Sequence, residues 1–164
     1  MSTFVSVGNA KQPFSRLLDH VRASVPELPA PVFVQHGHTP WQTMPGVESS
    51  AFLSMEDFAQ RVQSAQVVIL HAGAGSVIHA LRAGKIPILV PRRPDLAEHI
   101  DNHQSEFARE LAAAGKVVLF NDNTGFGVAV RQARQLQAQL ATATMMPPLI
   151  QMVAERLRRP LRPR

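Results

Sequence analysis

Short apolar runs alternate with amphipathic stretches along most of this chain of 164 residues. Five runs have the length of a strand and do not alternate apolar with polar residues. They therefore predict strands that are buried on both faces, as in a parallel sheet. The five runs are residues 4–7, 31–34, 67–70, 87–90 and 117–120. Because helical patterns separate them, the chain predicts an α/β fold with a Rossmann-like parallel sheet flanked by helices.

The amphipathic stretches place apolar residues three and four positions apart, which is typical of helices that pack on a core. Ser54, followed by acidic residues, predicts a helix start, and Gly84 and Gly115 predict helix ends. The predicted helices span residues 13–23, 54–65, 76–83, 102–114 and 127–141, with a last helix after Pro147 and Pro148. Residues 35–52 carry glycine, proline, threonine and serine without periodicity and predict a long surface connection.

The formal net charge of +5 comes from one end of the chain. Five of the 17 basic residues fall in the last nine positions, and the other 12 are balanced by 12 acidic residues. A neutral body with a basic tail argues against a broad nucleic-acid-binding face, so we expect no nucleic-acid partner. The tail suits an anionic membrane surface or an acidic partner, and a disordered solubilising tail is the alternative. We therefore divide the chain into a domain, residues 1–142, and a C-terminal helix with a basic tail, residues 143–164.

The chain has no cysteine, which excludes a disulfide framework, a thiolate nucleophile and a zinc–cysteine site. No apolar stretch approaches the roughly 18 residues that span a bilayer, and the first residues lack the basic and apolar regions of a secretory signal. We therefore expect a cytoplasmic protein that is soluble or peripheral at the inner face of the membrane.

The segment His71-Ala-Gly-Ala-Gly-Ser76 follows the predicted strand 67–70 and leads into a predicted helix. Such a turn leaves unpaired backbone N–H groups at a helix N-terminus, where the helix dipole favours negative charge, and so predicts a phosphate site. The alternative is a turn whose glycines only let the helix pack closely on the sheet, since the segment matches neither G-x-G-x-x-G nor the P-loop pattern. The residues of the predicted phosphate site are Gly73, Ala74, Gly75 and Ser76.

Two more candidate segments fall beyond the carboxyl ends of predicted strands, where ligands lie in an open parallel sheet. Gly8 allows the backbone to approach a ligand and Asn9 can donate to an oxygen, although an ordinary turn is an alternative. Residues 91–104 concentrate hydrogen-bonding groups, for which a solvated loop with Asp101 as a helix cap is the alternative. The candidate residues of this segment are Arg92, Arg93, Asn102, His103 and Gln104.

Seven histidines invite a metal hypothesis, and His99 and His103 stand four positions apart. The pair lacks the H-E-x-x-H pattern and the sequence indicates no third ligand, so we expect neither a metal nor another cofactor. A serine–histidine–aspartate triad is equally unsupported, because Ser76 does not lie in a G-x-S-x-G pattern.

Several of these segments, taken together, resemble one family. They are residues 4–8 with residues 12–14, then residues 32–36, 71–76 and 101–104. They resemble the C-terminal, nucleotide-sugar-binding half of the family 28 glycosyltransferases over about residues 3–120. Similar proteins are the small soluble subunits of two-component UDP-N-acetylglucosaminyltransferases and their bacterial exopolysaccharide counterparts. The resemblance implies one half of a GT-B fold that holds a UDP-sugar as substrate, while a membrane-anchored partner supplies the other half and the lipid-linked acceptor.

Carried over onto this chain, the resemblance implies that the Gly8 and Gly73 turns lie against the diphosphate, where arginine adds positive charge. Ribose would then lie at His79, and the sugar hydroxyls at the end of the polar segment. Relatives usually have glutamate in place of His79, and imidazole cannot grip a diol in bidentate fashion. They also usually have threonine in place of Asn9 and a second glycine in place of Ala72. The residues that the resemblance implies are Gly8, Asn9, Gly73, Ala74, Gly75, Ser76, His79, Asn102, His103 and Gln104, with Arg92 and Arg93 as possible phosphate contacts.

The leading hypothesis is therefore a donor-binding subunit of a two-component glycosyltransferase. It would transfer a hexose or an N-acetylhexosamine to a lipid-linked acceptor in polysaccharide biosynthesis. No residue here is a convincing general base for the acceptor hydroxyl, so we expect the catalytic base on the partner. The alternative is a noncatalytic partner-binding module with a degenerate nucleotide site. Residues 127–157 carry amphipathic helices that either contact the partner or pack back on their own domain.

Overall fold

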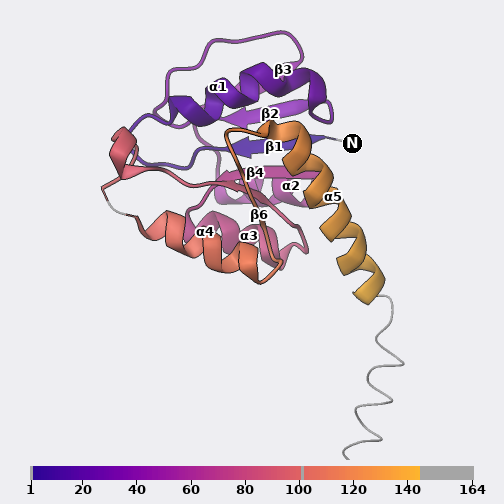
Figure 1. Ribbon diagram of the computed structural model, residues 1–164. Helices are drawn as coiled ribbons and strands as arrows, with labels where there is room; N and C mark the ends of the chain where they lie inside the picture. Colours follow the sequence, from indigo (N-terminus) through magenta and orange to yellow (C-terminus); the bar gives the residue numbers. More distant parts are fainter. Residues whose placement is uncertain (1, 101, 145–164) are drawn as a thin grey trace, which may run out of the picture.

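Six parallel strands form one sheet in the computed structural model, which describes residues 2–100 and 102–144 (Figure 1). Their order in the sheet is β3-β2-β1-β4-β5-β6. This order confirms the α/β, Rossmann-like parallel sheet that the sequence predicts. The strands are β1 (Thr3–Ser6), β2 (Val32–Gln35), β3 (Val47–Ser50), β4 (Val67–His71), β5 (Ile88–Val90) and β6 (Val118–Leu119).

Helices follow the strands in sequence and cover both faces of the sheet. Side chains of α1 and α5 pack on the face to which Val5 and Ile69 point. Side chains of α2, α3 and α4 pack on the opposite face, with Phe4 and Leu70. Burial on both faces explains why the strands read as continuous apolar runs. The α-helices are α1 (Ser15–Ser24), α2 (Met55–Ser64), α3 (Ala74–Arg82), α4 (His103–Ala113) and α5 (Gly125–Thr144), and the 3₁₀ helices are η1 (Val25–Glu27) and η2 (Pro94–Leu96).

One strand lies in the segment that the sequence assigns to a surface connection. Residues 47–50 form β3 and pair in parallel with β2, from Val32 opposite Val47 to Gln35 opposite Ser50. The prediction that residues 35–52 contain no element is therefore wrong. An edge strand pairs on one side only and needs no continuous apolar run, so its pattern is weak.

The ends of the observed helices differ from the predicted ends by one to three residues. Helix α3 begins at Ala74, two residues before the predicted start at Ser76, and α5 runs from Gly125 to Thr144 rather than over 127–141. Asn102 precedes α4 without a side-chain cap, and the predicted cap at Asp101 lies outside the described residues. The predicted last helix and the basic tail, beyond Thr144, also lie outside them.

The sheet reverses its order between β1 and β4, which are neighbours although residues 7–66 separate them in the chain. The connections that leave these two strands run to opposite sides of this point. In a doubly wound sheet, such a switch point opens a crevice outside the carboxyl ends of the strands. The topology therefore brings the Gly8 turn and the Gly73 turn to the same place.

Candidate functional site

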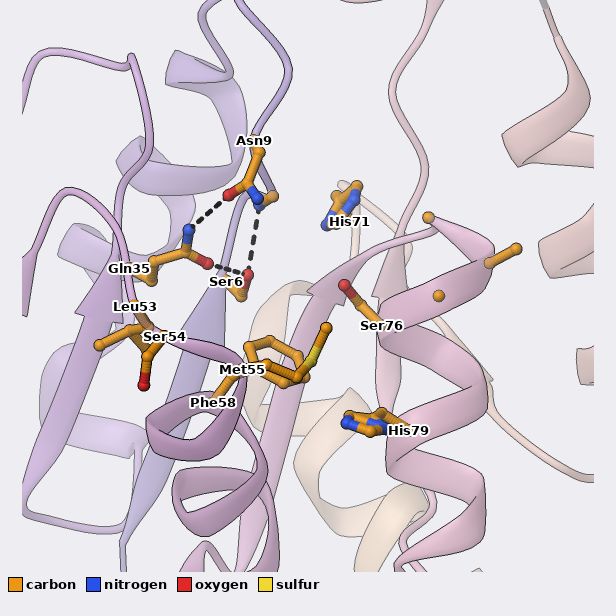
Figure 2. Close-up of a pocket in the computed structure, with 14 residues that line it drawn as sticks. Ser6, Asn9, Gln35, Leu53, Ser54, Met55, Phe58, His71, Ser76 and His79 are labelled. Atoms are coloured by element: carbon orange, nitrogen blue, oxygen red, sulfur yellow. Dashed lines mark hydrogen bonds between the residues drawn. The ribbon is translucent and has the colours of Figure 1, made fainter.

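A cavity of about 280 Å³ lies at the carboxyl ends of β1, β2 and β4. Figure 2 shows Ser6, Asn9 and Gln35 on one side of it and Ser76 and His79 of α3 on the other. Seven of the residues singled out from the sequence line this one pocket: Gly8, Asn9, Gly73, Ala74, Gly75, Ser76 and His79. The other lining residues are Ser6, Gln35, Leu53, Ser54, Met55, Phe58 and His71.

The N-terminus of α3 faces this pocket. Gly73 is the N-cap residue in an extended conformation, and no side chain caps the helix. The first intrahelical hydrogen bond runs from the Val77 N–H to the Gly73 carbonyl oxygen, at 3.1 Å. Helix geometry therefore leaves the N–H groups of residues 74–76 available to a ligand. Together with the helix dipole, these groups favour an anion at this position.

The His71 ring separates the two glycine turns. A Cβ atom built on Gly73 would lie 2.2 Å from His71 Nε2, and one built on Gly8 would lie 2.4 Å from His71 Cε1. Gly8 also has a φ of +77°, which L-residues with side chains rarely adopt. Only residues without a side chain let both turns close on this ring. The imidazole thus forms the wall between the two turns.

His71 is a neutral imidazole at physiological pH. Its side chain is nine-tenths buried, and its Nδ1 has no hydrogen-bond partner within the described residues. Burial and the positive charge of Arg92 lower its pKa to about 4, while the main chain of Ser6 beside the ring acts in the opposite direction and His99 has a smaller lowering effect. A neutral imidazole donates from one ring nitrogen and accepts at the other. The ring can therefore donate one hydrogen bond to a ligand without bringing a charge.

A chain of hydrogen bonds fixes the opposite side of the pocket. The Ser6 hydroxyl donates to Gln35 Oε1, and the Gly8 N–H donates to Ser6 Oγ at 3.2 Å. Gln35 Nε2 in turn donates to Asn9 Oδ1 at 3.0 Å (Figure 2). Because this bond occupies the amide oxygen of Asn9, its NH₂ group remains to donate to a ligand.

The third side of the pocket is apolar and belongs to the start of α2. Met55 is 72% exposed beside the opening, and Phe58 stacks on the His79 ring with a centroid distance of 6.0 Å and an interplanar angle of 23°. His79 Nε2 is buried and has no hydrogen-bond partner within the described residues. The site therefore combines a flat apolar wall with an unsatisfied imidazole nitrogen.

The residues of the polar segment 91–104 do not line this pocket. His103 is exposed at the start of α4, and Gln104 Oε1 accepts from the Arg92 N–H at 3.2 Å. Arg93 pairs with Asp95, with a distance of 2.6 Å between Nη2 and Oδ2, on the surface. Asn102 is exposed beside a second, shallower cavity, which Arg93 also lines. The structure thus brings the two turns together but leaves this segment beside them.

Arg92 is placed differently from the sequence expectation. Its side chain is fully buried and donates to the carbonyl oxygens of Val7, Gln12 and Glu98. These bonds turn the guanidinium toward the protein backbone and away from the pocket. The structure therefore does not provide the predicted phosphate contact from Arg92.

The charge of the pocket is low. Its lining includes two histidines but no lysine, arginine, aspartate or glutamate. Within the described residues there is also no cluster of three histidine, aspartate or glutamate side chains that could hold a metal ion. The pocket therefore offers main-chain amides and neutral polar groups to a ligand.

Sequence reasoning missed the strand-end and α2 residues of this pocket. Ser6 and Gln35 are the last residues of β1 and β2, whereas the sequence predicts these strands over residues 4–7 and 31–34; only the parallel pairing of the two strands brings Ser6 and Gln35 side by side. In the sequence, Phe58 and Met55 fit the apolar face of a helix, and this pattern does not indicate that they line a pocket. The signal that could have been used for His71 was its position at the start of the glycine-rich segment, two residues before Gly73.

A parallel sheet in the order 321456, with its pocket at the switch point, is a Rossmann-like fold, and solved structures show this fold as one half of GT-B proteins. The glycosyltransferase of kitacinnamycin superposes with a TM-score of 0.66 and 17% identity over 87% of this chain and 37% of that one. MurG of Acinetobacter baumannii superposes with a TM-score of 0.57 and 22% identity over 85% of this chain and 43% of that one.

The chain belongs to glycosyltransferase family 28: the family's C-terminal domain matches residues 3–155. The UDP-N-acetylglucosamine transferase subunit ALG13 of Yarrowia lipolytica is 33% identical over 106 residues, which are 63% of this chain and 50% of that protein.

A bacterial relative matches a longer part of the chain. The UDP-N-acetylglucosamine–N-acetylmuramyl-(pentapeptide) pyrophosphoryl-undecaprenol N-acetylglucosamine transferase of Pseudomonas fluorescens is 31% identical over 159 residues, which are 93% of this chain and 42% of that protein. The chain thus spans half or less of the length of these curated relatives. Within the described residues, no helix is long and apolar enough to cross a membrane.

Proposed function

We propose that the pocket binds the diphosphate of a UDP-sugar and that the chain is the donor-binding subunit of a two-component glycosyltransferase. The observation that carries this proposal is the uncapped N-terminus of α3, which faces the Gly8 turn across the His71 ring. The N–H groups of residues 74–76 are the donors that a phosphate at this position needs. The membership of the chain in family 28 supports a nucleotide-sugar as the source of that phosphate.

The comparisons support a partner. ALG13 is described as a subunit of a UDP-N-acetylglucosamine transferase, and this chain, like one half of a GT-B fold, lacks a second domain among its described residues. We assign the missing half to a membrane-anchored subunit that binds the lipid-linked acceptor. The bacterial relatives act on an undecaprenol-linked acceptor by name, which supports transfer of a hexose or an N-acetylhexosamine in polysaccharide biosynthesis. The complex would lie at the inner face of the membrane, held by the partner and by the basic tail.

In this function the chain stabilises the leaving group. The α3 amides and the neutral His71 would hydrogen-bond the diphosphate as negative charge develops on it. Asn9 would add its NH₂ group from the other side. With a pKa of about 4, His71 is a poor base at neutral pH, so the base that activates the acceptor hydroxyl belongs to the partner.

The remaining expectations concern the nucleoside and the sugar. The unsatisfied His79 Nε2 and the Phe58 ring would face the ribose side of the nucleotide. His103 and Gln104 would contact sugar hydroxyls from the edge of the site, which requires the segment 98–104 to keep its place beside the pocket. Arg93 is the remaining candidate for an added phosphate contact.

Isothermal titration of the chain with UDP and with UDP-N-acetylglucosamine tests the proposal. We expect binding of both by the isolated chain, and sugar transfer only after the partner is added. No UDP binding at millimolar concentration would contradict a donor site and would leave the noncatalytic partner-binding module.

The variant His79→Glu further distinguishes a donor-binding subunit from a noncatalytic partner-binding module. A carboxylate can accept two ribose hydroxyls at once, so we expect UDP to bind more tightly to this variant if ribose lies there. An unchanged UDP affinity, together with intact partner binding, would support the noncatalytic module.

A further inference from the structure

Arg92 is the largest fully buried side chain of the described residues. Its hydrogen bonds run to main-chain carbonyls, its Nε has no partner among the described residues, and the buried Glu98 carboxylate favours its charged form. Its Nη1 donates to Gln12 O at 2.8 Å and to Glu98 O at 3.1 Å, and its Nη2 donates to Val7 O at 3.0 Å. The guanidinium also lies over the Phe14 ring, 4.6 Å from its centroid. Burying a charge is costly, so an arginine here needs a reason beyond filling space.

The three carbonyls belong to two separate parts of the candidate site. Val7 and Gln12 flank the turn that begins with Gly8, whereas Glu98 belongs to the loop between β5 and α4. Val7 directly precedes Gly8, so the bond to its carbonyl fixes the entry to the first glycine turn. One side chain thus ties the diphosphate turn to the loop that leads to residues 102–104.

The same loop is fastened at further points. The Arg92 N–H donates to Gln104 Oε1, and the Glu98 carboxylate accepts from the Arg93 N–H at 2.9 Å and from Arg16 Nε at 3.0 Å. His99 lies close enough to His71 for its charge to lower the pKa of that imidazole. The loop is therefore held beside the pocket wall, and Arg92 is the side chain that connects it to the segment after β1, at Val7 and Gln12.

Lysine cannot replace this arrangement. A guanidinium presents several N–H donors in a fixed planar arrangement and can donate to three carbonyls at once. The three donors of a lysine ammonium group share one nitrogen atom at the end of a flexible side chain. Stacking on Phe14 adds a contact that the planar group makes best. The geometry thus depends on the planar arrangement of donors and not only on the positive charge.

We propose that Arg92 is a positioning residue that sets the distance between the diphosphate turn at Gly8 and the sugar-contact segment at residues 102–104. This inference rests on the proposed function, since it assigns the two subsites to one UDP-sugar. Arg92 touches neither the nucleotide nor the sugar. Its effect appears only in ligands that occupy both subsites at once.

The experiment compares UDP with UDP-N-acetylglucosamine and UDP-glucose in Arg92→Lys and Arg92→Met. The quantity measured is the ratio of the Kd for UDP to the Kd for whichever UDP-sugar binds more tightly, which reports the affinity that the sugar adds. We expect this ratio to fall about fivefold, as for one lost hydrogen bond. The affinity for UDP itself should change less. The loss should be smaller for lysine, which retains one charged donor, than for methionine.

Arg16→Met is the matched control. Arg16 also binds the Glu98 loop, through its carboxylate and the Pro91 carbonyl, but from the α1 side and without a bond to β1. We expect this variant to unfold at a lower temperature while the sugar-to-UDP ratio falls less than in Arg92→Lys, because Arg16 makes no bond to the segment that holds the Gly8 turn.

The outcomes separate the claims. The positioning role would be overturned if Arg92→Lys weakened the binding of UDP and of UDP-sugar by the same factor. It would also be overturned if the sugar-to-UDP ratio fell as far in Arg16→Met as in Arg92→Lys. A wild-type chain that binds UDP but gains nothing from the sugar would overturn it too. A wild-type chain that binds neither ligand would instead refute the proposed function. If Arg92→Met does not fold, Arg92→Lys supplies the comparison.

Discussion

His71 makes two glycines of the pocket costly to replace. A Cβ on Gly73 would lie 2.2 Å from His71 Nε2, and the Gly8 turn blocks the ring on its other side. We expect Gly73→Ala to destabilise the protein by about 1–3 kcal/mol, as for other overpacked sites, and to weaken UDP binding. Urea unfolding and titration with UDP measure the two effects.

Gly75→Ala is the control on the same helix turn. No atom lies within 4 Å of a Cβ at Gly75, so we expect the free energy of unfolding to change by no more than about 0.5 kcal/mol. The double variant His71→Ala with Gly73→Ala should regain part of the stability that Gly73→Ala alone loses. If Gly75→Ala is as harmful as Gly73→Ala, the clash with His71 is not the cause.

His71 also makes stability depend on pH. Its pKa is about 4 in the folded protein and 6.5 when unperturbed, so between these values the unfolded chain binds a proton that the folded chain does not. Stability is therefore full above pH 6.5 and falls as the pH drops toward 4. The expected contribution is a loss of about 2 kcal/mol between pH 7 and pH 5. Urea unfolding at both values measures it, and His71→Gln should lose distinctly less.

At the level of single residues, sequence patterns predicted the two turns but not their surroundings. Gly8 was predictable because it directly follows an apolar run, and Gly73 because it belongs to a glycine-rich segment between a predicted strand and a predicted helix. Arg92 could not be predicted, since an arginine in a polar segment reads the same whether it faces a ligand or three carbonyls. Only the fold shows that its partners, such as Val7, lie inside the protein.

Helix α2, which lines the apolar side of the pocket, depends on its cap. Ser54 Oγ accepts from the Asp57 N–H at 3.0 Å and donates to the Asp57 carboxylate at 2.6 Å. We expect Ser54→Ala to lower the free energy of unfolding by about 1 kcal/mol, because two N-terminal contacts are lost. Urea unfolding of the full chain measures the change.

Ser64→Ala provides the comparison at the other end of α2. The Ser64 hydroxyl donates only to the Arg61 carbonyl, at 3.3 Å, and is exposed. Alanine favours the helix, so we expect a change of no more than about 0.5 kcal/mol. A similar loss in both variants would mean that the cap does not hold the helix start.

At the level of elements, burial decided what could be predicted. The five strands buried on both faces carry continuous apolar runs and were predicted in their correct places. β3 has only one neighbour, and its residues are exposed or partly exposed, so its pattern lacks that signal. The early start of α3 at Ala74 was hidden because glycine and alanine fit a turn as well as a helix end.

The described residues contain both apolar cores and the complete lining of the pocket. We therefore expect a chain that ends at Thr144 to unfold cooperatively, with a melting temperature within about 5 °C of the full chain, and to keep its UDP affinity. Calorimetry and titration test this. Loss of partner binding in the same variant would support a docking role for residues 145–164, whereas loss of folding would show that they belong to the core.

At the level of the whole molecule, the class of fold was predictable and the strand order was not. Alternating strands and helices fix a parallel sheet, but the order 321456 depends on where the crossovers turn back, which no local pattern records. The site depends on exactly that reversal between β1 and β4. Gln35 of β2 therefore reaches the pocket only through its pairing with β1, a place that its position in the sequence does not indicate.

The two ends of the sheet bear on how the protein can associate. β6 has only two residues, and β3 is a strand of four residues with the exposed Glu48 in its middle. Short or charged borders offer little backbone for another chain to extend by strand addition. We therefore expect a second protein to bind through side-chain surfaces rather than at these two sheet edges, so that copies of this chain do not join into continuous β-structure.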